Sequence, residues 1–238
     1  MDAKLLAFRK LYAVVKDSPV LDVARTALLF SALVYFSNDF INKIGDEIGA
    51  EHLSIGETDG LKFIYIRYKG SKFVAFRGTE FSMWSNTKRV LNFLPKKNLH
   101  GRKAHRGFVM AFSDLKKLID PLIFNPKSVI FTGHSLGGAL ATLAAEHYDA
   151  GAIAFASPKV FFNENVSGKI AYVGYGVRGD IVTQVPPTTF FMKWSRPTPH
   201  FLWKSAKKFL NPFSYHHVGV YIDYLLENMD ERGNFKTR

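Results

Sequence analysis

The sequence predicts an α/β fold in which helices flank a mostly parallel central sheet. Three features of the 238-residue chain indicate this fold. Helical patterns occupy the first forty residues, short β-rich runs follow them, and from Ser128 onward strand, helix and strand alternate. Strands separated by helices pair in parallel, because the helix carries the chain back across the sheet.

The N-terminal part is expected to form helices over about residues 1–50. Apolar side chains recur there at spacings of three and four, in two sets separated by Pro19. The first set comprises Leu5, Phe8, Tyr12 and Val15, and the second comprises Val23, Ala27, Phe30 and Val34. Packing on the core is favoured for both helices over a role as a membrane anchor.

Two β-rich runs, Leu61–Tyr68 and Phe73–Phe76, are joined by Lys69-Gly70-Ser71, which predicts a hairpin. The later elements are a strand, a helix and two strands, at Ser128–Thr132, Gly137–Tyr148, Ala152–Ala156 and Ile170–Val177. The chain has no internal repeat and no linker rich in Gly, Ser or Pro. We therefore expect a single domain over residues 1–238.

Composition narrows the classes of function. Hydrophobic residues make up 47% and charged residues 22% of the chain, which excludes disordered, collagen-like and coiled-coil proteins. The chain has no cysteine, so disulfides, thiolate metal sites and a cysteine nucleophile are excluded. With 32 Lys+Arg against 20 Asp+Glu, the net charge of 32 − 20 = +12 favours anionic partners.

The 22 phenylalanines favour a lipid surface over nucleic acid as that partner, because phenylalanine offers nothing to base edges or phosphates. No secretion signal and no apolar run of membrane-spanning length is recognised. We expect a protein that is cytoplasmic or peripheral to a membrane, with no nucleic acid bound.

The chemistry centres on Gly133-x-Ser135-x-Gly137, the pattern of a nucleophile elbow. In such an elbow a serine is held on a tight turn between a strand and a helix, and larger side chains two residues to either side would collide. The pentapeptide alone is a weak signal. Its context strengthens it, because an apolar strand precedes it and a helical pattern follows it.

A serine nucleophile needs a histidine base and an acid that orients this base, and in this fold the acid and then the histidine follow the serine. The candidate bases are His200, His216 and His217. Of the acids Asp149, Glu164 and Asp180, the last is favoured, because it follows the C-terminal end of a predicted strand, where sites in open α/β sheets lie.

At this point the sequence resembles the class 3 lipases, which are α/β-hydrolases and include the fungal triacylglycerol lipases. Six motifs in the family's order carry the resemblance over residues 60–222. They are Phe76-Arg-Gly-Thr79, His105-Arg-Gly-Phe108, Gly133-His-Ser-Leu-Gly-Gly138, Ala156-Ser-Pro-Lys159, Gly179-Asp-Ile-Val182 with Pro186-Pro187, and Tyr215-His-His-Val-Gly219. The resemblance implies an α/β-hydrolase fold and a serine hydrolase that requires no metal and no organic cofactor.

The resemblance also assigns the site residue by residue. Ser135 matches the nucleophile and Asp180 the triad acid. The family's closing motif, Tyr-x-His, places the base at His217, with His216 as the alternative. Thr79 matches the oxyanion-hole residue, whose backbone N–H would join that of Leu136 around the developing negative charge. His134 and His105 are interpreted as structural.

In the resembling lipases, a lid that opens at a lipid surface follows the oxyanion residue. Residues 80–100 occupy that position here, and the family's Asp-Trp pair is replaced by Met83-Trp84. Trp84, Phe93 and Leu94 are candidate substrate or lid contacts, although an ordinary surface loop would also fit. A second stretch, 190–210, has helical spacing over its last ten residues and could line the acyl pocket, face the membrane or pack on the core.

The sequence thus predicts a serine carboxylic-ester hydrolase that acts on lipid or small ester substrates through an acyl-enzyme. Two alternatives stay open. One is a non-catalytic protein that binds lipid surfaces or nucleic acid through its basic face, and the other is an acyltransferase. The acyl specificity and the oligomeric state are not encoded in these motifs.

Overall fold

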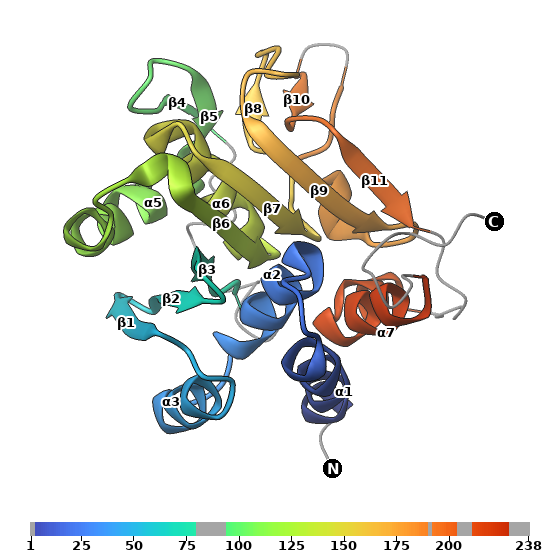
Figure 1. Ribbon diagram of the computed structural model, residues 1–238. Coiled ribbons are helices and arrows are strands. Elements are labelled where there is room, and N and C mark those ends of the chain that lie inside the picture. The colour runs from blue at the N-terminus through green and yellow to red at the C-terminus, as the bar shows by residue number, and fades with distance from the viewer. Residues whose placement is uncertain (1–2, 80–93, 190–191, 204–210, 229–238) are drawn as a thin grey trace.

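The computed structural model describes residues 3–79, 94–189, 192–203 and 211–228 (Figure 1). Its centre is a sheet with the strand order β1-β2-β3-β6-β7-β9-β11. The strands of this sheet are β1 (His52–Thr58), β2 (Leu61–Tyr68), β3 (Ser71–Phe76), β6 (Val129–His134), β7 (Gly151–Phe155), β9 (Ala171–Val177) and β11 (His200–Trp203). The first three strands pair antiparallel, and every pairing from β3 to β11 is parallel. The predicted α/β-hydrolase fold with a mostly parallel sheet is confirmed.

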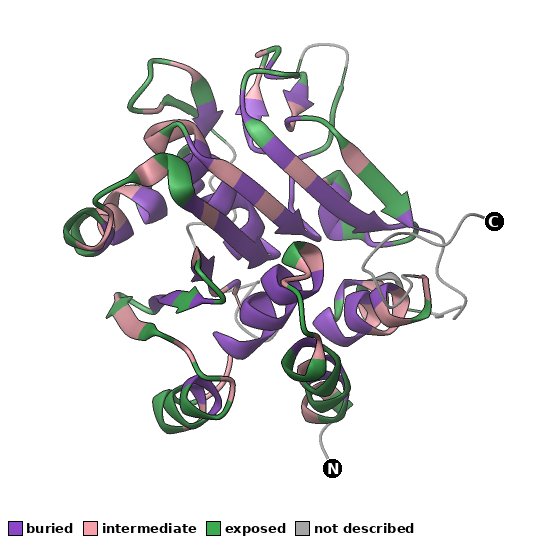
Figure 2. Cartoon of the chain, viewed as in Figure 1, coloured by how far each residue is buried: buried purple, intermediate pink, exposed green. Residues whose placement is uncertain are grey.

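Helices cover both faces of this sheet (Figure 1). One face carries α5 (Arg106–Ile119) and α6 (Leu136–Tyr148), and the other carries α1 (Ala3–Asp17), α2 (Val23–Leu33) and α7 (Val218–Asn228). Helix α3 (Asn38–Glu47) contacts β1 at the edge of the sheet. Each face has its own cluster of buried apolar side chains. The central strands are accordingly buried along most of their length, whereas α1 and α3 expose their outer sides (Figure 2).

Local sequence explains where several helices begin. The side chain of Asp22 accepts the backbone N–H of Arg25 at the start of α2, and the hydroxyl of Ser37 accepts that of Phe40 at the start of α3. Such caps satisfy N–H groups that have no partner within the helix. Helix α1 buries Phe8, as the helical spacing predicts.

A smaller antiparallel sheet lies beside the main one. Its strands, in the order β10-β8-β5-β4, are β10 (Trp194–Ser195), β8 (Phe161–Phe162), β5 (Lys103–His105) and β4 (Pro95–Lys97). Strand β4 falls within residues 80–100, the segment expected to form a lid, so the described end of that segment is anchored by pairing with β5. Trp84 and Phe93 lie outside the described residues.

The hairpin β2–β3 and the elements β6, α6, β7 and β9 are confirmed where the sequence predicts them. The helical interpretation of the segment 201–210 is wrong over Phe201–Trp203, which belongs to β11. The cause is tertiary, because β9 offers a free edge whose backbone groups pair with β11. Residues 204–210 lie outside the described residues. Among the described helices, none has both the length and the hydropathy needed to cross a bilayer.

Candidate active site

Ser135 lies at the sharp turn between β6 and α6. Its backbone has φ +62° and ψ −129°, a combination that L-residues rarely adopt, so the serine is held in a strained position by its surroundings. The Ser135 N–H is bonded to the carbonyl of Phe155 on β7. This geometry is that of a nucleophile elbow, in which the first free N–H groups of α6 lie next to the serine.

The two flanking glycines are required by close backbone contacts. A Cβ built on Gly133 would lie 2.3 Å from the backbone carbon of Gly137, and one built on Gly137 would lie 2.1 Å from the carbonyl oxygen of Phe76. Both distances are far below van der Waals contact, and the obstructing atoms are backbone atoms that cannot rotate away. The elbow therefore depends on glycine at both positions.

A continuous chain of hydrogen bonds connects Ser135, His216 and Asp180. The Ser135 Oγ lies 2.8 Å from His216 Nε2, and His216 Nδ1 lies 2.9 Å from Asp180 Oδ2 and 3.1 Å from Oδ1. Because an ionised carboxylate can only accept, Nδ1 carries the imidazole proton and Nε2 is left to accept from the serine hydroxyl. All three residues are buried, and Ser135 has no exposed surface.

The assignment of the base to His217 is corrected by this geometry. His217 is exposed, and its Nδ1 accepts the backbone N–H of Gly219 at the start of α7. His216 ends the 3-10 helix η5 (Pro212–His216), and the backbone is extended at His217 (φ −68°, ψ +132°). Neighbouring side chains on such a backbone point in different directions. The histidine that is hydrogen-bonded to Ser135 and Asp180 thus follows Tyr215 directly, one position earlier than the family motif places the base.

The Asp180 carboxylate accepts hydrogen bonds from three groups, one of which is the N–H that it caps at the start of the 3-10 helix η4 (Ile181–Gln184). The carboxylate receives His216 Nδ1–H, the backbone N–H of Val182 at 2.9 Å and the Tyr221 hydroxyl at 2.6 Å. The Tyr221 oxygen in turn accepts the N–H of Val177 at 3.1 Å. Burial, followed by the charge of Asp180, raises the pKa of Tyr221 well above its ordinary value, so the phenol stays a donor.

Arg196 braces the turn that carries Asp180. Its guanidinium donates to the carbonyls of Ser157 and Thr183, and it lies 2.9 Å from His200 Nε2. Thr183 belongs to the 3-10 helix η4 (Ile181–Gln184), which begins at Asp180. The predicted competitors for the acid are engaged elsewhere: Asp149 pairs with Lys127, and Glu164 accepts the N–H of Lys103.

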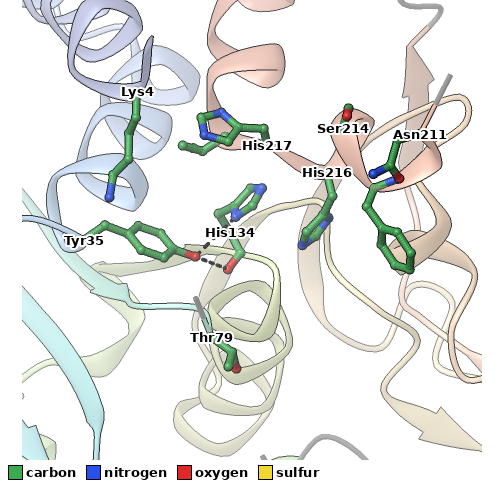
Figure 3. A pocket seen from close by; sticks show the side chains of 10 residues that line it. Lys4, Tyr35, Thr79, His134, Asn211, Ser214, His216 and His217 are labelled. Carbon is green, nitrogen blue, oxygen red and sulfur yellow. Dashed lines mark hydrogen bonds between the residues drawn. The ribbon is translucent and has the colours of Figure 1, made fainter. Parts of the chain in front are cut away.

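A cavity of about 370 Å³ opens beside His216 (Figure 3). Thr79, His134 and His216 line it, together with residues of η5 and α1. Thr79 Oγ1 is buried and has no hydrogen-bond partner among the described residues, and the Tyr35 hydroxyl accepts the N–H of the preceding Gly78 at 3.1 Å. Thr79 thus presents an unused polar group on a loop that Tyr35 holds against the elbow.

His134 and His105 have structural contacts, in line with their interpretation from the sequence. The Tyr35 hydroxyl lies 3.3 Å from His134 Nδ1 and 3.4 Å from its carbonyl oxygen (Figure 3). Burial, with nearby His216 and His217, lowers the pKa of His134 well below its ordinary value and keeps the ring neutral. His105 caps α5 by accepting the N–H of Phe108. Leu94 is 62% exposed and is not among the described residues that line the cavity.

The sequence did not indicate Tyr35, Tyr221 or Arg196. Each is a polar residue in a segment without a recognisable motif, and its role arises from contacts with residues far away in the chain. The one local signal is the position of Tyr221, a single turn into the helix that follows the histidine pair.

Comparison with known protein families finds a match for the middle part of the sequence. Residues 73–190 match the family described as lipase (class 3). The matched region contains Thr79, Ser135 and Asp180, and it ends before His216.

Solved structures of fungal lipases share the fold. The mono- and diacylglycerol lipase of Aspergillus oryzae superposes with a TM-score of 0.57 at 20% identity, covering 73% of this chain and 77% of that one. A lipase of Rhizopus microsporus var. chinensis gives 0.51 at 22% identity, with 78% and 71% covered. Lipase II of Rhizopus niveus gives 0.51 at 21% identity, with 77% of each chain covered. The chain spans 62% of the length of the triacylglyceride lipase of Rhizomucor miehei.

Proposed function

Because this chain belongs to the class 3 lipases, a family of carboxylic ester hydrolases, we propose that it hydrolyses acyl esters of lipids with Ser135 as the nucleophile. One observation carries the proposal: the chain of hydrogen bonds from Ser135 through His216 to Asp180 beside an open cavity. We propose these three residues as the catalytic triad.

The geometry supports the following steps. His216 Nε2 takes the hydroxyl proton as Ser135 Oγ attacks the acyl carbonyl, and Asp180 stabilises the imidazolium that forms. The imidazolium then gives its proton to the leaving alcohol, and an acyl-enzyme remains. Water, deprotonated by His216, then attacks this ester, the carboxylic acid is released, and His216 returns the proton to Ser135 Oγ. The hydrogen bonds from Tyr221 and Val182 hold the Asp180 carboxylate in the orientation that both acylation and deacylation need.

The oxyanion is proposed to lie between the backbone N–H of Leu136, at the start of α6, and Thr79. The helix start places positive partial charge where the negative charge develops. Thr79 Oγ1, which has no hydrogen-bond partner within the described part of the chain, supports a second donor from this loop. Loss of one such donor typically lowers kcat by about 10²–10³-fold.

We also propose that the protein meets its substrate at an anionic lipid surface. Ser135 has no exposed surface in this conformation, so the residues that cover it must shift before an acyl chain can reach it. Phe213, which lines the cavity, and Ile181, next to Asp180, are 41% and 42% exposed and would face such a surface. The net charge of +12 would draw the protein to it.

Both core clusters pack on one sheet, which supports a single domain.

The proposal is tested with p-nitrophenyl esters of increasing acyl length, assayed with and without anionic vesicles. The variant Ser135→Ala is compared with Ser214→Ala, which removes a serine hydroxyl from the lining of the cavity beside His216. We expect turnover in the wild type and in Ser214→Ala, none in Ser135→Ala, and covalent labelling of Ser135 by a fluorophosphonate. Vesicle binding without turnover would instead favour a non-catalytic lipid binder. Acyl transfer would appear as ester products when an alcohol is added.

A further inference from the structure

Helix α1 brings a positive charge into the cavity that holds the triad. Lys4, in the first turn of α1, extends toward Tyr35 on the cavity wall (Figure 3). Among the described residues that line this cavity, it is the one lysine, arginine, aspartate or glutamate. The formal charge of these described lining residues is therefore positive, and it comes from a helix that supplies none of Ser135, Asp180 and His216.

The Lys4 ammonium lies against two aromatic rings. Its Nζ lies 5.1 Å from the centre of the Tyr35 ring and 4.9 Å from that of Phe36. The hydroxyl of the same Tyr35 accepts the Gly78 N–H and contacts His134, the residue before the nucleophile. One tyrosine side chain thus touches both the ammonium and the loop that carries Thr79.

A lysine held in this way is prepared to bind an anion. Contact with the two ring faces restricts the side chain, so less conformational entropy is lost when a ligand binds. Lys4 is half-buried, and an ion pair formed inside a cavity is screened less than one on the surface. His134 stays neutral, since its pKa is lowered well below the ordinary value by burial and by its neighbours.

We propose that Lys4 binds an anionic group of the substrate, and that the preferred substrates are glycerophospholipids rather than neutral glycerides. In a glycerophospholipid the phosphodiester lies on the carbon next to an acyl ester, so an acyl carbonyl at Ser135 brings the phosphate into the same cavity. This inference rests on the proposed ester hydrolysis and names its substrate class.

The experiment compares two substrates with the same acyl chains. Dihexanoylphosphatidylglycerol and dihexanoylglycerol are used below their critical micelle concentrations, so that the attraction of a basic protein to a charged surface plays no part. The ratio of their kcat/KM values is measured for the wild type, Lys4→Gln, Lys4→Arg and Arg9→Gln. Arg9 is exposed on the same helix and does not line the cavity, so its variant controls for net charge.

We expect the wild type to prefer the phospholipid and Lys4→Gln to lower the ratio about tenfold, the value typical of one charge-assisted hydrogen bond. Lys4→Arg should keep most of the preference, Arg9→Gln should keep all of it, and added salt should reduce it in the wild type. An unchanged ratio in Lys4→Gln would overturn the inference. If kcat/KM falls equally for both substrates, Lys4 only supports Tyr35.

The experiment distinguishes failure of the proposed ester hydrolysis from failure of the inference about Lys4. If neither substrate is hydrolysed in a Ser135-dependent way, the proposed function fails and the inference about Lys4 falls with it. If Ser135-dependent hydrolysis is present but the ratio does not depend on Lys4, only the inference about the phosphate group fails.

Discussion

The two segments that meet at Ser135 are specified in different ways. The elbow, residues 133–138, is defined by neighbours in the sequence: a strand, a serine at positive φ and glycines whose absent side chains leave room for backbone. The histidine segment, residues 211–218, offers two adjacent imidazoles, and only contacts with Asp180 and Ser135 distinguish them. Local sterics can be read from a pentapeptide, whereas the choice between neighbouring histidines depends on how a turn is placed in the fold.

The largest expected effect separates the two histidines. His216→Ala removes the group bonded to both Ser135 and Asp180, and we expect kcat/KM for a p-nitrophenyl ester to fall by about 10⁴-fold or more. His217→Ala removes an exposed ring that caps α7, and we expect a change of less than about tenfold. Steady-state kinetics of both purified variants measures this difference. The reverse order of effects would restore His217 as the base.

The next largest expected effect is a loss of stability when a side chain is added at a glycine of the elbow. In Gly137→Ala the new methyl group would lie 2.1 Å from the Phe76 carbonyl oxygen, and we expect the free energy of unfolding to fall by about 3 kcal/mol or more. Gly151→Ala is the matched control, since no atom lies within 4 Å of its Cβ position. Urea unfolding followed by circular dichroism gives both values. Equal stabilities for the two variants would contradict the steric account.

A smaller effect concerns the support of the triad acid. Tyr221→Phe removes the 2.6 Å hydrogen bond to Asp180, and we expect kcat to fall about tenfold with little change in KM. Tyr224→Phe, on the same helix and stacked on Trp203, serves as the control. An unchanged kcat in Tyr221→Phe would argue against a positioning role.

The smallest expected effect is a change of stability with pH that arises from the half-buried His200. Burial, with nearby Arg196, lowers the pKa of His200 to about 3, whereas an unfolded histidine has a pKa of about 6.5. Below pH 6.5 the unfolded chain therefore binds a proton that the folded chain does not. Stability from this residue is complete above pH 6.5 and is lost as the pH falls from 6.5 toward 3.

We expect the wild type to lose about 1 kcal/mol from this source between pH 7 and pH 5, a value reduced for the partial exposure of the ring. His200→Gln should show a correspondingly smaller loss, and His52→Gln, at an exposed histidine, should behave like the wild type. Urea titrations at the two pH values measure this. Parallel losses in all three proteins would exclude His200 as the source.

The sequence alone predicted the elements whose patterns are local. The hairpin β2–β3 follows from two β-rich runs around Lys69-Gly70, and β6 and α6 follow from the apolar run and helical pattern around the elbow. The strand β11 was missed because four residues are too few to define a period, and its pairing with β9 decides its conformation. Asp180 could be favoured from its position after a strand, because functional sites in parallel sheets lie at the C-terminal ends of the strands.

Sequence by itself therefore predicted the fold class and favoured Ser135 as the nucleophile and Asp180 as the acid, since each prediction depends on short-range periodicity or on the steric needs of one turn. Tertiary structure decided which histidine completes the hydrogen-bonded chain, which tyrosines brace it and that Lys4 reaches the cavity. These last assignments join residues as far apart in the chain as Lys4 and His216. Such contacts arise from packing of helices on a sheet, and no local pattern records the direction in which a single side chain will point.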